Sequence, residues 1–315
     1  MIPPPMKQEV TIFCPATVSN VGPGFDLLGF ALEAPGDRLT VRRNTVGALR
    51  IINESGVPLP GDPSENVAAI ATEAMLEDLH ASGGFDLVFT EKIPPGSGIG
   101  SSAASCVAAV MGINELLGAP LSPEAMLPFA MTGEEHASGS YHADNIAPAL
   151  LGGMTLIRGY DPLEIKHIPY PDDLWCALVH PELEFKTSEG RKILPTEVPL
   201  NDALTQAGNL AGLVAGLMSS DYGLISRSIR DVFAEPYRVK NLPHFDDLKQ
   251  RVLDEGALGT GLSGSGPSIF ALCRGENISR TVAAIMQNHF EQHGIASQFY
   301  VSRISQAGCR LLSSS

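Results

Sequence analysis

Hydrophobic and polar residues recur along the chain with two periods, and these periods predict strands that alternate with helices. Period-2 alternation or a short apolar run predicts strands at 8–14, 38–43, 48–53, 85–90, 154–158, 175–179, 268–273 and 298–304. Apolar residues at helical spacing predict helices at 67–79, about 101–118, 123 to about 133, 201–218, 220–230, 245–255 and 279–293. The mixture predicts a fold that contains both α-helices and β-strands.

Prolines, glycines and capping residues set the expected ends of these elements. Pro15 is expected to end the first strand, and Gly133 to end the helix that begins at residue 123. Asn201 is expected to cap the helix 201–218, whose apolar face includes Leu204. The polar segment 185–192 is expected to start a short helix that Pro195 closes, and the tail 311–315 is expected to fray.

Length, charge and cysteine usage narrow the class of protein. The 315 residues exceed one usual compact core, so two lobes are expected, 1–160 and 161–315. A net charge of −14 without a basic run argues against binding to nucleic acid or to an anionic membrane. The five cysteines are far apart and form no Cys-x-x-Cys pair, which favours reduced, mostly buried thiols in a cytoplasmic protein. No apolar run approaches the length of a membrane span.

Alternating glycines mark the stretch 93–102, Ile-Pro-Pro-Gly-Ser-Gly-Ile-Gly-Ser-Ser, which leads into an apolar helix. Glycines of this kind let backbone amides turn inward, and the free N–H groups at a helix start attract an anion. The stretch therefore predicts a phosphate-binding loop, with an ordinary strand-to-helix turn as the alternative. It lacks the lysine of a Walker A loop and the spacing of a dinucleotide-binding loop.

Three other polar stretches are candidates for the same site. The loop 15–29 is punctuated by glycines, and the cluster 259–267 is expected to approach either a ligand or the first glycine loop. The segment 133–153 gathers carboxylate, imidazole and amide side chains, although one histidine beside carboxylates is weak support for zinc. Ser102 and Glu134 can supply the hydroxyl and the carboxylate that Mg²⁺ needs in phosphoryl transfer.

The loops 15–29, 93–105 and 259–268 resemble the three motifs of the superfamily of galactokinase, homoserine kinase, mevalonate kinase and phosphomevalonate kinase (GHMP kinases). Markers between them resemble the homoserine kinase family in particular: His-Ala-Asp-Asn-Ile-Ala-Pro at 142–148 with Gly152-Gly153, Thr187 followed by Arg191, and Glu-Pro-Tyr-Arg at 235–238. The resemblance covers nearly the whole chain. It implies an α+β fold with a nucleotide-binding lobe like ribosomal protein S5 domain 2, then a ferredoxin-like lobe that contributes to the substrate site.

The same resemblance implies an activity and assigns residues to it. The expected reaction transfers the γ-phosphate of ATP to the side-chain hydroxyl of L-homoserine, a step towards threonine, in a protein that is a homodimer. The phosphates are expected on Pro94, Pro95, Gly96, Ser97, Gly98, Ile99, Gly100, Ser101, Ser102, Ala103 and Ala104. Mg²⁺ is expected on Glu134 and on Ser102, or else Ser101. The expected catalytic residues are Glu134, Thr187, Asp144 and Asn145, and the expected amino-acid pocket contains Asn20, Asp26, His142, Arg191 and Arg238.

Several assignments keep an alternative at this point. Arg191 and Arg238 can each bind the substrate carboxylate through two N–H groups of the guanidinium. The alternative, which would be the default without the family motif, is that both are solvated charges on the surface. Asp144 is a candidate general base, because related kinases such as mevalonate kinase use an aspartate in a comparable loop. The resemblance to homoserine kinases implies instead a reaction that relies on positioning and charge stabilisation, without a dedicated base. In that case Asp144 orients His142 or caps a turn. His136 receives no role. The alternative functions are another kinase of the superfamily, such as one acting on mevalonate, and an inactive nucleotide-binding regulator.

Overall fold

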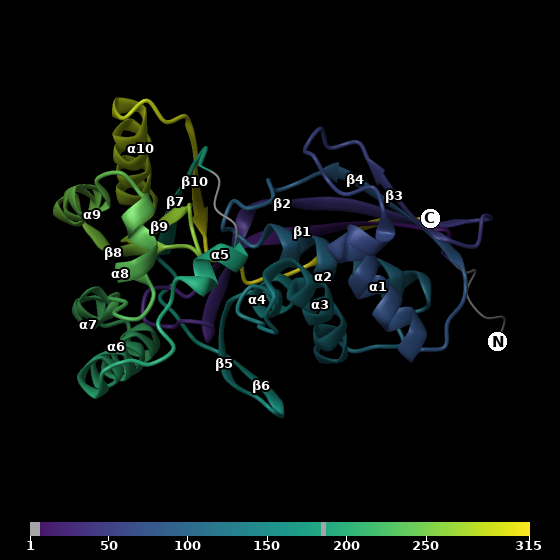
Figure 1. Ribbon diagram of the computed structural model, residues 1–315, viewed down its shortest axis with the longest axis horizontal. Helices are drawn as coiled ribbons and strands as arrows, with labels where there is room; N and C mark the ends of the chain where they lie inside the picture. Colours follow the sequence, from purple (N-terminus) through teal and green to yellow (C-terminus); the bar gives the residue numbers. More distant parts are fainter. Residues whose placement is uncertain (1–6, 184–186) are drawn as a thin grey trace.

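The computed structural model describes residues 7–183 and 187–315, without the side chains of 187–189 and 241. Two lobes lie side by side, each built on its own sheet (Figure 1). The first sheet follows the order β11–β1–β2–β4–β3, and β5 pairs with both β2 and β6. β3 and β4 pair in parallel, and the other pairs are antiparallel. Its strands are β1 (Glu9–Ser19), β2 (Leu28–Asn44), β3 (Leu49–Asn53), β4 (Gly84–Glu91), β5 (Met154–Tyr160), β6 (Leu163–His167) and β11 (Arg310–Ser314).

Helices of the first lobe stack on one side of this sheet. α2 contacts β1 and β2, while α1 and α3 pack against α2. Because α2 lies between the sheet and two helices, its alanine and valine side chains are buried nearly all the way round. The helical elements here are η1 (Pro63–Glu65), α1 (Val67–Asp78), α2 (Ser101–Leu116), α3 (Pro123–Ser138) and α4 (Ile146–Leu151).

The second lobe has a four-stranded antiparallel sheet in the order β10–β7–β9–β8. Together with α9 and α10 it follows the chain order β7–α9–β8–β9–α10–β10, which confirms the ferredoxin-like arrangement. Its strands are β7 (Leu174–Pro181), β8 (Ala257–Leu262), β9 (Ile269–Arg274) and β10 (Ser297–Arg303). Its helices are α5 (Thr187–Lys192), α6 (Leu200–Ser219), α7 (Tyr222–Ser228), α8 (Glu235–Arg238), η2 (Val239–Asn241), α9 (Phe245–Asp254) and α10 (Glu276–Gln292).

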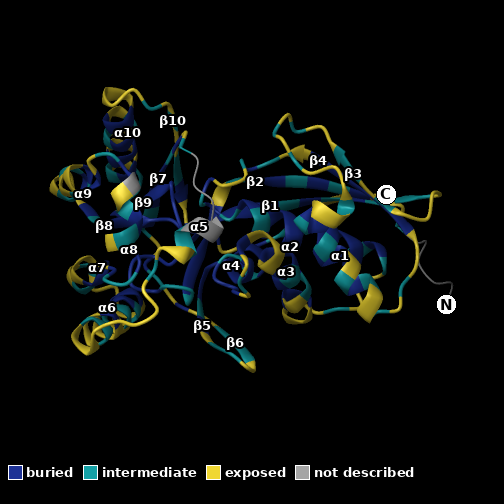
Figure 2. Cartoon of the chain, in the orientation of Figure 1, coloured by how far each residue is buried: buried dark blue, intermediate teal, exposed yellow. Residues whose placement is uncertain are grey.

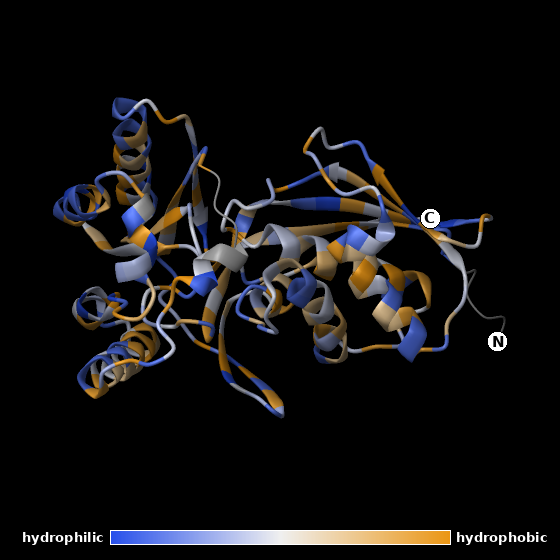
Figure 3. Cartoon of the chain, in the orientation of Figure 1, coloured by the Kyte–Doolittle hydropathy of each residue, from blue (hydrophilic) through white to orange (hydrophobic). Residues whose placement is uncertain are grey.

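Two hydrophobic clusters form the core. The larger one joins the first sheet and its helices to α6 and α7 through Leu213, Leu217 and Ile225, and the smaller one lies between the second sheet, α9 and α10. The buried positions in Figure 2 run along the strands and the inner sides of the helices, where Figure 3 shows much of the hydrophobic sequence. Among the described residues, no helix is both long enough and apolar enough to cross a bilayer.

Two expected element ends are wrong for reasons of local packing. Pro15 lies within β1, opposite Gly36, where the ladder to β2 shifts register and so tolerates a residue without an N–H group. Gly133 does not end α3, which continues to Ser138 and carries Glu134 on a helix. A side chain at Gly133 would collide with the Val67 carbonyl of α1, so this glycine serves close helix packing.

Expectations for the C-terminal half also need correction. The tail does not fray, because Arg310–Ser314 forms β11 and pairs with β1. β6 and β11 lie beyond residue 160 yet belong to the first sheet, so the two sheets do not divide at residue 160. The boundary between the lobes at residues 160 and 161 stays a prediction. α6 begins at Leu200 after Pro199, without a side-chain cap from Asn201, and Leu204 is 63% exposed instead of buried.

Candidate active site

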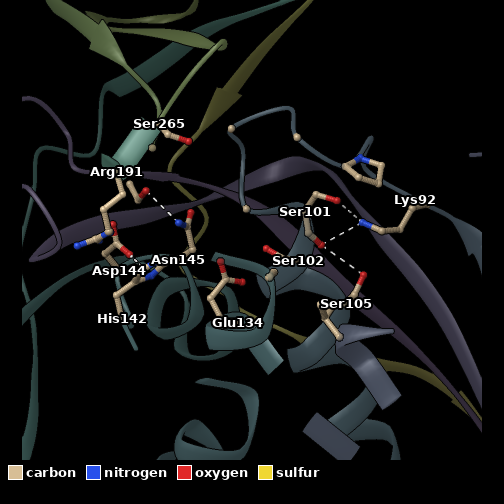
Figure 4. A pocket seen from close by; sticks show the side chains of 18 of the residues that line it. Lys92, Ser101, Ser102, Ser105, Glu134, His142, Asp144, Asn145, Arg191 and Ser265 are labelled. Carbon is tan, nitrogen blue, oxygen red and sulfur yellow. Dashed lines mark hydrogen bonds and ion pairs between the residues drawn. The ribbon is translucent and has the colours of Figure 1, made fainter. Parts of the chain in front are cut away.

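A cavity of about 640 Å³ is lined by residues of both lobes. Many of the expected site residues line it: Asn20, Asp26, Pro95, Gly96, Gly98, Gly100, Ser101, Ser102, Glu134, His142, Asp144, Asn145, Arg191 and Arg238. Pro94, Ser97, Ile99, Ala103 and Ala104 are not part of this lining. In Figure 4, Arg191, Asp144 and His142 gather at one end, Lys92 and Ser101 lie at the other, and Ser102 and Glu134 lie between them.

The first glycine loop has the backbone of an anion cradle. Gly96, Gly98 and Gly100 have φ angles of +73°, +80° and +72°, in the left-handed region that favours glycine. A side chain at Gly100 would overlap the Thr17 hydroxyl, so glycine is also required there by space. α2 follows without a side-chain cap at Gly100, which leaves the first N–H groups of the helix to attract an anion.

The second glycine cluster packs against the first glycine loop. Ser263 donates a hydrogen bond from Oγ to the Gly98 carbonyl at 2.7 Å, and Ser268 donates one to the Ser97 carbonyl at 2.6 Å. A Cβ atom at Gly98 would lie 2.6 Å from the Gly266 carbonyl oxygen. Of the two alternatives for this cluster, contact with the first loop is therefore observed, and Gly264 also lines the cavity.

An ion pair that sequence reasoning missed lies beneath the glycine loop. Lys92 Nζ is 3.1 Å from Asp37 Oδ2, and the two side chains are 2% and 0% exposed. Lys92 also donates to the carbonyls of Ile93 at 2.9 Å and Ser101 at 3.0 Å, so it ties the two ends of the loop together. Burial lowers the pKa of Lys92 and raises that of Asp37, and the charge of each partner opposes these shifts.

The two adjacent serines of the loop have different surroundings. Ser101 donates from Oγ to the Ile93 carbonyl at 2.8 Å and so points to the Lys92 side of the loop. Ser102 lies beside Glu134 (Figure 4), and its hydroxyl group acts to lower the pKa of that carboxyl. This arrangement favours Ser102 over Ser101 as a partner of Glu134.

Glu134 is a buried carboxylate with unused bonding capacity. It is 4% exposed, and its Oε2 atom has no hydrogen-bond partner. Burial raises the pKa of Glu134, although the charge of His142 and the neighbouring Ser102 hydroxyl group act against this rise. A buried carboxylate oxygen beside a hydroxyl group fits a hard divalent cation that keeps several waters. Within 7–183 and 187–315, no group of three or more His, Cys, Asp or Glu residues is arranged to hold a metal ion.

His142 and Asp144 form a buried ion pair at the other end of the cavity. His142 Nδ1 lies 3.1 Å from Asp144 Oδ1. Burial acts to lower the pKa of His142, but the close contact with the charged Asp144 outweighs it and raises this pKa to about 9. Burial acts to raise the pKa of Asp144, but His142 and a hydrogen bond from Ser19 hold it below its usual value. Of the alternatives for Asp144, the contact that orients His142 is observed.

Asn145 is fixed against β1 beside the start of α2. Its Oδ1 atom accepts a hydrogen bond from Thr17 Oγ1 at 2.7 Å, and its Nδ2 atom donates to Ser19 Oγ at 2.9 Å. These two contacts hold the amide in one orientation at the cavity wall.

Arg191 and Arg238 converge on the loop between β1 and β2. Arg191 Nη2 donates to both carboxylate oxygens of Asp26 at 2.7 Å. Arg238 is 5% exposed and donates to the carbonyls of Gly264 at 3.0 Å and Gly190 at 3.1 Å. Both guanidinium groups also lie over the Phe25 ring, 5.5 and 5.3 Å from its centroid. The alternative that these arginines are solvated surface charges is therefore wrong.

The loop that carries Asp26 is held in a strained backbone conformation. Asn20, Val21 and Asp26 have φ angles of +67°, +44° and +57°, which are costly for residues other than glycine. Asn20 holds this shape, because Oδ1 accepts from the Asp26 N–H at 3.0 Å and Nδ2 donates to the Gly264 carbonyl at 2.9 Å. Tyr160, also missed by sequence reasoning, donates to the Asp26 carbonyl at 2.7 Å.

Thr187 and His136 make no described side-chain contact in this site. Thr187 begins α5, but its side chain lies outside the described part of the chain. His136 lies on an exposed position of α3.

Comparisons with known proteins place the chain in a family. The N-terminal domain of GHMP kinases matches residues 66–153, and the C-terminal domain of GHMP kinases matches residues 213–292. Homoserine kinase of Chloroherpeton thalassium is 44% identical over 321 residues, covering 98% of this chain and 100% of that protein. The chain belongs to the homoserine kinase family. The crystal structure of a homoserine kinase from Cytophaga hutchinsonii superposes with a TM-score of 0.93 at 45% identity over 98% of both chains.

A more distant kinase shares the fold alone. The mevalonate kinase of L. major has a TM-score of 0.75 but only 18% identity, with 96% of this chain and 99% of that chain covered. Membership of the homoserine kinase family therefore rests on the closer relatives. The match to the GHMP kinases implies the use of ATP.

Proposed function

We propose that the protein transfers the γ-phosphoryl group of ATP to the side-chain hydroxyl of L-homoserine, giving O-phospho-L-homoserine and ADP for threonine biosynthesis. The hydroxyl oxygen bonds to the γ-phosphorus as the bond to the β,γ-bridging oxygen breaks, and the hydroxyl proton ends in solvent. The observation that carries the proposal is that Arg191 and Arg238 lie in the same cavity as the phosphate-binding loop. The proposed sites for the amino acid and for the nucleotide would therefore adjoin.

The glycine loop would bind the phosphates of ATP. Its inward-turned amides and the N-terminus of α2 supply hydrogen-bond donors and partial positive charge for the phosphates. The cavity wall also contains the apolar residues Leu59, Val67 and Phe89. These residues would contact the nucleotide base, because apolar walls suit a flat heterocycle.

Ser102 and Glu134 would hold Mg²⁺. The unpartnered Oε2 atom of Glu134 supports this assignment, since a buried carboxylate with free lone pairs is costly without a cation or a donor. When bound, Mg²⁺ neutralises charge on the phosphates of ATP. We propose that Thr187 lies near the γ-phosphate, as the family resemblance implies.

The amino-acid pocket would hold homoserine by its two charged groups. The N–H groups of Arg191 that do not bind Asp26, together with Arg238, suit the substrate carboxylate. Asp26 and the Oδ1 atom of Asn20 suit the ammonium group, and His142 lies near them at the cavity wall. Mevalonate and galactose have no ammonium group, so this pocket suits them poorly.

The reaction would proceed without a dedicated general base. A base works best when its pKa lies near the working pH. The pKa of Asp144 is held below its usual value by His142 and Ser19, against the effect of burial, so this carboxylate is a weak proton acceptor. Asn145, held rigidly by Thr17 and Ser19, would instead help to position the hydroxyl group at the phosphorus.

We also propose a cytoplasmic homodimer with its contact on the outer side of α6. The five cysteines form no disulfide, which supports a reducing compartment. Leu200, Leu204 and Met218 are 74%, 63% and 59% exposed along α6. Asp202 is the single charged residue of this helix in a chain of net charge −14, so α6 offers copies a contact with little repulsion.

Product analysis tests the proposed reaction. Purified protein with Mg²⁺ and ATP is incubated separately with L-homoserine, mevalonate and galactose, and products are identified by ³¹P NMR and mass spectrometry. We expect O-phospho-L-homoserine from the first mixture and only background phosphorylation in the other two. Phosphorylation of mevalonate in preference to homoserine would contradict the proposal.

A further inference from the structure

Gln206 is a buried polar residue on the inner side of α6, outside the cavity. It is 4% exposed and lies four residues before Leu210 and seven before Leu213, on the helix face that packs inward. A primary amide has two donor hydrogens and an acceptor oxygen, and burying them without partners is costly. The partners of this side chain therefore have to be found within the protein.

Each of these groups has a partner. Gln206 Nε2 donates to the Pro23 carbonyl and to Asp231 Oδ1, both at 2.9 Å. Gln206 Oε1 accepts from the Val232 N–H at 2.8 Å. One side chain on α6 thus joins the β1–β2 loop to the segment that precedes α8.

The elements joined in this way carry opposite sides of the amino-acid pocket. Pro23 lies three residues before Asp26 in the β1–β2 loop. Asp231 accepts hydrogen bonds from the N–H groups of Phe233, Ala234 and Glu235, and so fixes the start of the short helix that ends at Arg238. A shift of Gln206 would move both elements relative to each other.

We propose that Gln206 is a positioning residue that sets the distance between the ammonium-binding and carboxylate-binding sides of the homoserine pocket. The inference rests on the proposed function. Asp26 and Arg238 belong to different lobes, so their separation depends on contacts such as this one and on the Gly264 carbonyl, to which Asn20 and Arg238 both donate. The residues that line the nucleotide part of the cavity have no bond to Gln206, so its effect is specific to the amino acid.

Two substitutions remove the hydrogen bonds in different ways. Gln206→Met keeps the volume but leaves the Pro23 carbonyl, Asp231 and the Val232 N–H without this partner. Gln206→Glu keeps the shape and an acceptor for Val232, but loses both donors and places a carboxylate against Asp231. Asn209→Ala is the matched control, because Asn209 lies one turn further along α6 and donates only to the Arg230 carbonyl, at 2.9 Å.

The experiment measures kcat and the KM values for L-homoserine and for ATP in the wild type and the three variants, with melting temperatures recorded for each. Both Gln206 variants should raise the KM for homoserine at least about tenfold and leave the KM for ATP within about twofold. Asn209→Ala should leave both KM values within about twofold of the wild type. If Gln206→Met does not fold at the assay temperature, Gln206→Glu supplies the same comparison.

The outcomes separate this inference from the function on which it rests. An unchanged KM for homoserine in the folded Gln206 variants, or equal rises in the KM values for homoserine and ATP, would overturn the positioning role. Turnover of homoserine by the wild type would still support the proposed kinase activity. A wild type that does not phosphorylate homoserine would overturn the proposed function, and this inference with it.

Discussion

Lys92 and Asp37 form an ion pair directly beneath the phosphate-binding loop, with 3.1 Å between Nζ and Oδ2. Asp37 also accepts from the Ile93 N–H at 2.8 Å and from Ser105 Oγ at 2.8 Å. The pair therefore connects β2 to both ends of the loop and to the first turns of α2. Such a buried pair fixes the shape of the loop more than it adds to stability.

Lys92→Met should lower both the stability and the nucleotide affinity of the protein. The substitution leaves the buried Asp37 carboxylate without its cation, which should reduce the free energy of unfolding by about 3–5 kcal/mol. It should also raise the KM for ATP, because the ends of the loop are no longer tied. Urea denaturation and steady-state kinetics measure these effects. The double variant Lys92→Met, Asp37→Asn should recover much of the stability but not the KM, and an equal recovery of both would refute the proposed role in shaping the loop.

Glu134→Gln should lower kcat by about 100- to 1,000-fold, the loss typical of removing one charge-stabilising group. Because burial already raises the pKa of Glu134, neutralising this side chain should not lower the melting temperature. Steady-state kinetics across a Mg²⁺ titration and a thermal melt test both statements. A variant that keeps wild-type dependence on Mg²⁺ would show that Glu134 is not a metal ligand.

Asp144→Asn should keep measurable turnover. Its carboxylate, whose pKa is held low, orients His142 and accepts no proton in the proposed reaction. The loss in kcat should therefore stay below about 100-fold, the lower end of what a general base contributes. The matched comparison is Glu134→Gln under the same conditions. A loss as large as that of Glu134→Gln would establish Asp144 as an essential base.

The pKa of His142 should lie near 9 in the folded protein, because Asp144 and Glu134 outweigh its burial. Since an unfolded histidine titrates near about 6.5, the ion pair stabilises the fold fully below that pH. This contribution is lost as the pH rises through about 9. A ¹H–¹³C NMR titration of the imidazole, assigned with His142→Asn, measures the value. Asp144→Asn should shift the pKa downward, and an unshifted value would refute the coupling.

Local patterns in the sequence predicted the parts of the site that depend on neighbouring residues. Alternating glycines marked the loop at Gly96, Gly98 and Gly100 because the left-handed backbone itself favours glycine. The family motif placed Arg191 and Arg238 in one pocket, and the structure lines one cavity with both. Local sequence and the family motif were therefore enough to predict these features, without information on contacts between distant parts of the chain.

Features that depend on distant partners were missed. Asp37 lies 55 residues before Lys92, and β11 pairs with a strand at the other end of the chain, so neither contact has a local signal. Gln206 did leave a signal, as a polar residue on the inward face of α6, but its partners Pro23 and Asp231 become visible only in the fold.

The most direct test compares wild type and Arg191→Met with L-homoserine and with 3-amino-1-propanol, which is homoserine without its carboxylate. If Arg191 holds the carboxylate, the variant should lose at least about 100-fold in kcat/KM for homoserine, the scale of a lost charge-assisted bidentate contact. Its kcat/KM for 3-amino-1-propanol should be unchanged or higher, since Asp26 is freed for the ammonium group. Equal losses with both alcohols would contradict the account of an amino acid held by its carboxylate against the phosphate-binding loop.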